Sequence, residues 1–191
     1  MNPNGNCDSI PTDWTAEPAA RLKRKNQVLF AKGSPFLSDL GTLLQGTDHR
    51  AAVLWALELA EQSVTELEKA YPEETRPREA LIAARDWSAG YIKMPLAQRK
   101  ILDCHGFAKE LTNKAHIALC HAVGQACAVV HTAGHALGYP MYELSAIVYR
   151  LGIHNCRDAV EQRRKTYIDR LLFWNAHWQE VNQPWAAFLD K

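Results

Sequence analysis

Residues 121–138, HAVGQACAVVHTAGHALG, decide the predicted fold of this chain. The stretch consists mostly of small residues, and its polar members recur at helical spacing: His121, Gln125, His131 and His135. This pattern predicts a helix over residues 114–137 that ends at Gly138. Because alanine and glycine let neighbouring backbones approach closely, we expect this helix at the centre of the molecule. Its polar side chains would then need partners, since a buried unpaired polar group costs about 1–3 kcal/mol.

The rest of the chain has the same helical period. Asp48 or Thr47 is a suitable N-cap, Pro77 and Pro95 suit the first turns of helices, and Asn113 can cap the central helix. No hairpin pattern is present, so the fold class is all-α. Helices are predicted over residues 17–31, 35–44, 47–71, 77–90, 94–111, 114–137 and 140–151, and from Asn155 or Asp158 to Pro184.

The domain organisation follows from the same pattern. We expect an N-terminal arm with short helices over residues 1–46 and a single bundle of about six helices over residues 47–191. Residues 1–17 have little periodicity, and we expect them to be mostly irregular and anchored by Trp14.

Charge and cysteine content narrow the function classes. The chain has 22 basic and 21 acidic residues, which argues against a general nucleic-acid or anionic-membrane binder. The run Arg163-Arg164-Lys165 lies beside Glu161 and Asp169, and we interpret it as a solvated helix face. Five cysteines without a CxxC pair, and a first segment unlike a signal peptide, favour free thiols in a reducing cytoplasm. No apolar run approaches the ~20 residues that span a bilayer.

His131 and His135 stand four residues apart, so on one helix both imidazoles would share a face. Such a pair can hold a metal with further ligands, for instance Cys127 or Cys120. The stretch contains no Asp or Glu and no HExxH pattern, however. We therefore favour neutral core imidazoles that bond to neighbouring helices, and no metal or other cofactor is assigned. The cysteines at 104, 120 and 127 fall inside apolar helices, where burial raises the thiol pKa, and we interpret them as packing residues.

Arginines and a carboxylate cluster around the helix predicted to begin at Pro77. Arg85 and Asp86 are adjacent and point in different directions, so one of them can reach inward. A buried Arg–Asp pair between helices is the simpler prediction. The functional alternative is a binding pocket in which Arg76, Asp86 and His105 converge on residues 121–138. Tryptophans at the end of the chain, at positions 174, 178 and 185, suit either the core or an interface with another protein.

Two blocks of residues carry a family resemblance that covers about residues 48–150. The first block contains His49-Arg50, Trp55-Ala56, Arg76-Pro-Arg-Glu-Ala80, Ala83-Ala-Arg85, Trp87 and Gly90. The second contains Gly124, Ala126, His131, His135, Ala136-Leu-Gly138 and Tyr142. Their order and spacing resemble the Imm5-like family of immunity proteins. The chain departs from the family at Cys120 and Cys127, where Ala or Arg is expected.

The resemblance implies an all-α cytoplasmic protein of a bacterial polymorphic-toxin system, which neutralises a cognate toxin domain by binding it. Family positions present in this chain are Arg76, Trp87, His131 and His135, although the resemblance does not distinguish binding from packing at them. The leading hypothesis is thus a toxin-binding protein without catalytic residues. The alternatives are a helical His-based metalloprotein or enzyme, and a homo-oligomeric scaffold. The pocket or partner-binding candidates are Arg76, Asp86, Trp87, His105, His121, Gln125, His131 and His135.

Overall fold

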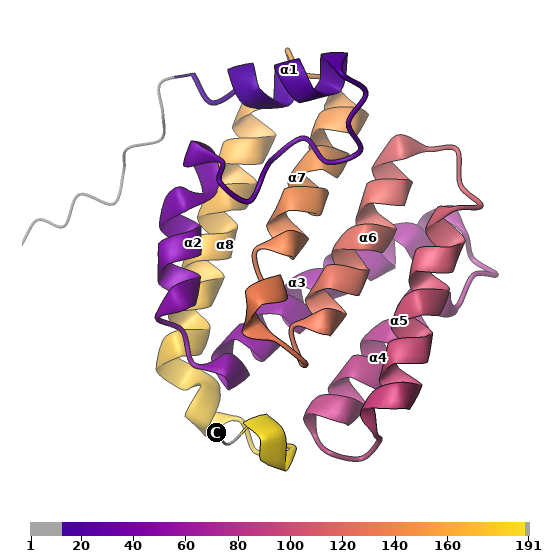
Figure 1. Ribbon diagram of the computed structural model, residues 1–191, viewed down its shortest axis with the longest axis vertical. Helices are drawn as coiled ribbons and strands as arrows, with labels where there is room; N and C mark the ends of the chain where they lie inside the picture. Colours follow the sequence, from indigo (N-terminus) through magenta and orange to yellow (C-terminus); the bar gives the residue numbers. More distant parts are fainter. Residues whose placement is uncertain (1–12, 190–191) are drawn as a thin grey trace, which may run out of the picture.

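A computed structural model describes residues 13–189, which form eight α-helices, four short 3-10 helices and no strand (Figure 1). The all-α prediction is confirmed, with eight helices in place of about six because α1 and α2 precede the six of the bundle. The α-helices are α1 Ala16–Lys23, α2 Ser38–Gln45, α3 His49–Ala70, α4 Arg76–Ser88, α5 Met94–Ala108, α6 Lys114–Ala128, α7 Gly138–Leu151 and α8 Arg157–His177. Cys7 and most of the predicted irregular arm lie outside the described residues.

Several predicted helix boundaries are confirmed by their capping contacts. The Asp48 carboxylate accepts the backbone N–H of Arg50 at 2.8 Å, and the Asn113 side chain accepts that of Ala115 at 2.9 Å. Pro77 lies in the first turn of α4. Gly152 follows α7 with φ +78°, a left-handed conformation that glycine adopts without strain.

The predicted continuous helix over residues 114–137 is wrong. Helix α6 ends at Ala128, the chain turns through a 3-10 helix at Ala133–His135, and α7 begins at Gly138 beside α6 (Figure 1). A β-carbon at Gly138 would lie 2.4 Å from Gln125 Oε1, so glycine is what lets α7 begin against α6. Val129 and Val130 in the turn are fully buried, so tertiary packing offsets the cost of interrupting the helix.

The helix predicted over residues 17–31 also ends early. It stops at Lys23, and the following segment places Leu29 and Phe30 in the core. The Leu29 backbone N–H donates to Ser145 Oγ of α7 at 2.8 Å. Trp14 anchors the preceding residues as expected: it is buried against Phe36, and its indole N–H donates to Glu161 Oε1 of α8 at 2.8 Å.

Candidate functional site

The connection between α6 and α7 carries His131 and His135, and both are exposed to solvent. They are therefore not core imidazoles, and they do not share one helix face, because α6 has ended before them. The His131 ring stacks on Trp87 of α4, with centroids 6.1 Å apart and planes 18° apart. His135 Nδ1 lies 3.1 Å from Gln125 Oε1 of α6. Each imidazole is thus held by one neighbour and open to solvent on its other side.

Buried contacts below the connection fix its backbone. His49 Nε2 at the start of α3 donates to the Val129 carbonyl at 2.6 Å. Val130 and Ala136 are buried on either side of the exposed turn. We call the surface formed by Trp87, Gln125, His131, Thr132 and His135 the connection face. Its exposed members are His131, Thr132 and His135, which are supported by the buried Trp87 and the half-buried Gln125.

His105 and His121 form a separate pair between α5 and α6. Their Nδ1 atoms are 2.9 Å apart, and His121 Nε2 lies 3.0 Å from the Gln27 amide nitrogen. The Gln27 amide donates to Nε2, so the His121 proton is on Nδ1 and is donated to His105 Nδ1. Burial lowers the pKa of both rings, to about 4 for His121, where the charge of His105 adds to the effect. Both rings are neutral in this arrangement.

Arg76 lies at the opposite end of α4 from Trp87. The eleven residue steps from Arg76 to Trp87 correspond to about 16 Å along the helix axis. Arg76 donates to Glu74 and to Glu110 of the segment after α5, and these contacts hold the pKa of both carboxyls below the usual value. Asp86 is half-buried one position before Trp87. The predicted convergence of Arg76, Asp86 and His105 on one pocket is therefore wrong.

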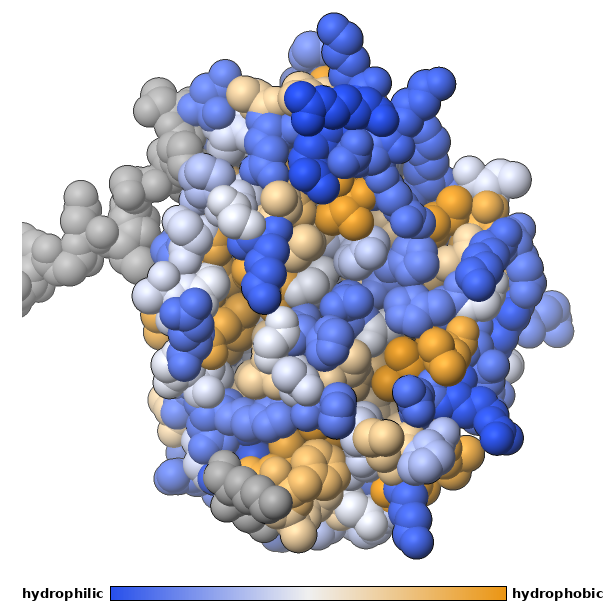
Figure 2. Space-filling model, in the orientation of Figure 1, coloured by the Kyte–Doolittle hydropathy of each residue, from blue (hydrophilic) through white to orange (hydrophobic). Residues whose placement is uncertain are grey.

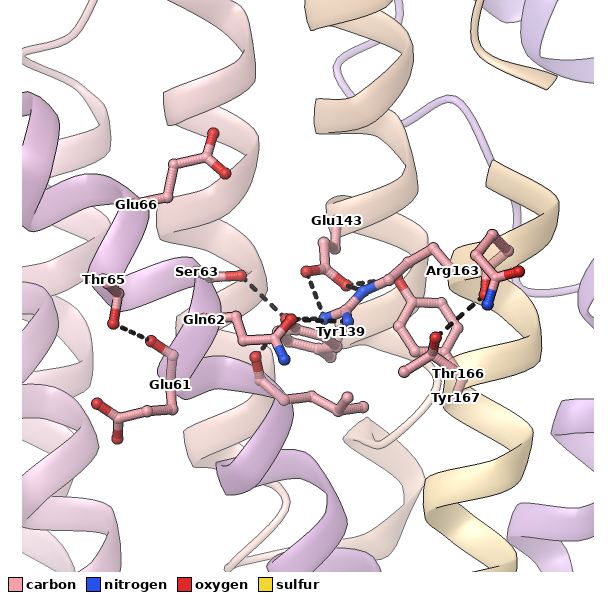
Figure 3. A network of polar contacts seen from close by, with 12 residues as sticks. Glu61, Gln62, Ser63, Thr65, Glu66, Tyr139, Glu143, Arg163, Thr166 and Tyr167 are labelled. Carbon is pink, nitrogen blue, oxygen red and sulfur yellow. Dashed lines mark hydrogen bonds and ion pairs between the residues drawn. The ribbon is translucent and has the colours of Figure 1, made fainter. Parts of the chain in front are cut away.

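The predicted buried Arg–Asp pair is also wrong, since Arg85 is exposed and pairs with Glu61 of α3 at 2.7 Å. A buried ion pair joins α8 to α7 instead, between Arg163 and Glu143 (Figure 3). The Arg163 Nε and Nη2 atoms donate to the two Glu143 oxygens at 2.8 and 2.7 Å. Tyr167 donates to the same carboxylate, and Gln62 of α3 accepts from Arg163 at 2.8 Å.

The run Arg163-Arg164-Lys165 is accordingly not a solvated face. Arg164 is buried, donates to the Phe36 carbonyl at 2.8 Å and pairs with Asp39 of α2. Within this run, Arg163 is half-buried and Lys165 is exposed. The helical stripe of α8 includes position 164, between Val160 and Tyr167, and that spacing was the available sign that an arginine points inward.

The prediction that Cys104, Cys120 and Cys127 are buried packing residues is confirmed. Cys104, Cys120, Cys127 and Cys156 are free and buried, and burial raises the pKa of the Cys127 thiol. Across residues 13–189, no three His, Cys, Asp or Glu side chains are grouped as metal ligands would be. None of the described helices is both long and apolar enough to cross a membrane.

These observations define an all-α protein in which the α6–α7 connection exposes two histidines at one end of a helical bundle. The chain belongs to the family described as Imm-5 like putative immunity protein, whose model matches residues 42–171. The match spans the whole of α3 to α7 and most of α8, and it includes the connection face. No curated protein and no solved structure matches the chain significantly.

Proposed function

We propose that this protein is a bacterial cytoplasmic immunity protein that binds a cognate toxin domain and neutralises it stoichiometrically, without catalysis. The observation that carries the proposal is the family match over residues 42–171. An immunity protein acts by occupying the surface of its toxin, so its functional requirement is a preorganised binding surface.

The connection face suits this role for a physical reason. Binding affinity concentrates in a few well-packed aromatic and polar side chains, and ordering mobile side chains costs about 0.5–1.5 kcal/mol each. Stacking on Trp87 and the contact with Gln125 already orient His131 and His135 in the free protein. A toxin that contacts these rings therefore has little side-chain entropy to remove.

The test uses the toxin-domain protein encoded by the gene beside that of this chain. Co-expression is expected to relieve toxin-induced growth arrest, and calorimetry is expected to show a 1:1 complex. Replacing both histidines (His131→Ala with His135→Ala) removes two oriented contacts, and we expect binding to weaken at least tenfold.

The matched control is His154→Ala, which removes an exposed histidine from the connection between α7 and α8. It should bind like the wild type. Absence of any complex between the wild-type chain and the neighbouring toxin domain would contradict the proposal. If the double replacement leaves the affinity unchanged, the toxin domain binds a surface other than the connection face.

A further inference from the structure

A groove of about 410 Å³ runs between α2 and the α6–α7 connection, next to the connection face. Its floor is apolar, with Leu44 and Leu137 above the fully buried Leu37, and Gly41 of α2 lies against Leu137. Its walls carry only small or hydroxyl side chains, apart from Gln45 and from Lys32 at one margin. Figure 2 views this side of the molecule, where pale and orange surface separates the blue patches.

One wall residue has an unused hydrogen-bonding group. Ser34 is only 2% exposed, yet its hydroxyl has no partner among the described residues, although it lines the groove. It precedes the 3-10 helix Pro35–Leu37 and makes no capping bond there. The hydroxyl is therefore available to donate to, or accept from, a ligand in the groove.

Two hydroxyls of α2 also line the groove, and they can act there only as acceptors. Ser38 Oγ donates to the Pro35 carbonyl at 2.9 Å, and Thr42 Oγ1 donates to the Ser38 carbonyl at 3.0 Å. With their protons committed to the backbone, these oxygens can only accept from a ligand. The two residues are one turn apart, about 6 Å along the axis of α2. In an extended peptide, the N–H groups that point to one side are about 6.7 Å apart. This spacing is close to that of the two hydroxyls, so one peptide can donate to both.

Charge distinguishes the groove from its surroundings. No carboxylate is among the described residues that line it, whereas Lys32 stands at its margin without an ion pair to any of residues 13–189. The family match begins at residue 42, so most of the α2 wall lies outside it. This wall can therefore serve recognition particular to this chain.

We propose that the groove receives an extended segment of the toxin domain, with backbone N–H groups bonded to Ser38 and Thr42 and an acidic side chain paired with Lys32. The proposal rests on the toxin-binding function proposed above. Alternate side chains of the segment pack on the apolar floor of the groove. The Ser34 hydroxyl forms a hydrogen bond with a carbonyl or amide group of the segment.

The experiment measures binding of the neighbouring gene's toxin domain to three full-length variants. Thr42→Trp fills the groove, and we expect at least thirtyfold weaker binding. Lys32→Glu reverses the charge at the margin, and about fivefold weaker binding is expected at low salt, with the difference shrinking as salt screens the pair. Ser34→Ala removes the unpaired hydroxyl and should weaken binding about threefold while leaving the thermal midpoint unchanged or raised.

The controls make the same replacements on α8, away from the groove. Thr166→Trp replaces a threonine that also bonds to the carbonyl four residues earlier, and Lys165→Glu reverses an exposed charge. Both should bind the toxin domain like the wild type. Circular dichroism of every variant verifies that the helices are retained, and Lys32→Glu provides the test if Thr42→Trp fails to fold.

The possible failures are distinguishable. If the wild-type chain forms no complex with the toxin domain, the proposed function and the groove proposal both fall. If the complex forms but tolerates all three groove variants, only the groove proposal is overturned. If sedimentation shows that the wild type self-associates and that Thr42→Trp abolishes this, the occupant is a second copy of the chain and the groove proposal is wrong.

Discussion

Single residues decide where the histidines of this protein can lie. A β-carbon at Gly124 would lie 2.4 Å from the His105 ring, so glycine there creates the space in which His105 reaches His121. The imidazole pair and its contact with Gln27 thus depend on one missing methyl group. Residue chemistry alone did not indicate this, because a glycine within a predicted helix has many explanations.

Gly124→Ala tests this dependence. The added methyl group must displace His105 or the backbone of α5, and we expect the free energy of unfolding to fall by about 1–3 kcal/mol. The measurement is urea denaturation followed by circular dichroism. Gly106→Ala on α5 is the control, because a β-carbon there meets nothing within 4 Å. That control should be neutral or stabilising by up to about 1 kcal/mol, since alanine favours helix. Equal effects of the two replacements would contradict the packing argument.

The His105–His121 pair also predicts a pH dependence. Burial lowers the pKa of His121 from 6.5 to about 4, so between these values the unfolded chain binds more protons than the folded one. Stability from this group is complete above about pH 6.5, falls as the pH drops to about 4, and changes no further below that. Because water screens the partly exposed rings, we expect a loss of about 1–2 kcal/mol.

The measurement for this prediction is the free energy of unfolding of the wild type and His121→Gln across pH 4 to 7. Comparison with the variant removes the contribution of carboxylates that titrate in the same range. The difference between the two proteins should shrink as the pH falls. A difference that stays constant would show that the pKa of His121 is not lowered in the folded protein.

At the scale of elements, the contact between α7 and α8 includes a buried charge pair. Arg163 and Glu143 satisfy each other through two hydrogen bonds, and Tyr167 and Gln62 complete the network (Figure 3). Such a pair gains little net free energy over apolar packing, but the loss of one partner leaves the other charge buried. The network therefore constrains how the two helices pack.

Arg163→Ala is expected to lower the free energy of unfolding by about 3–5 kcal/mol, because it leaves Glu143 buried without its cation. Arg85→Ala is the matched control, since it breaks an exposed pair with Glu61 whose contribution is under about 1 kcal/mol. Urea denaturation of both variants distinguishes the two cases. A loss below about 1 kcal/mol for Arg163→Ala would indicate that water reaches Glu143.

The predictions for helices succeeded where local chemistry controls the boundary. The starts of α3 and α6 follow from Asp48 and Asn113, whose side chains accept backbone N–H groups. The break after Ala128 was missed, because residues 121–138 keep the composition of a buried helix throughout. The helix is interrupted because α7 packs against α6 at Gly138, next to Gln125. The helical period places both residues in one helix and so does not predict this contact.

At the scale of the molecule, the candidate residues separate into three places. Arg76 lies at one end of α4, the His105–His121 pair lies between α5 and α6, and the connection face lies at the other end of α4. The proposed groove is lined in part by Ala133 and Gly134 of the α6–α7 connection, so it adjoins the connection face and the two proposals concern neighbouring surfaces. A toxin domain bound there would contact α2 and the α6–α7 connection together.

The sequence by itself determined the all-α class, most helix boundaries and the family, because helical periodicity, caps and motif spacing are local properties of the chain. The tertiary structure alone decided that His131 and His135 are exposed, that Arg163 and Arg164 point inward, and that the candidate site residues do not converge. Those outcomes depend on contacts between distant segments, such as α7 on α6 and α8 on α7. The stretch 121–138 therefore has the periodicity of one helix. Packing at Gly138 and burial of Val129 and Val130 end α6 within it, and the turn that follows exposes two histidines.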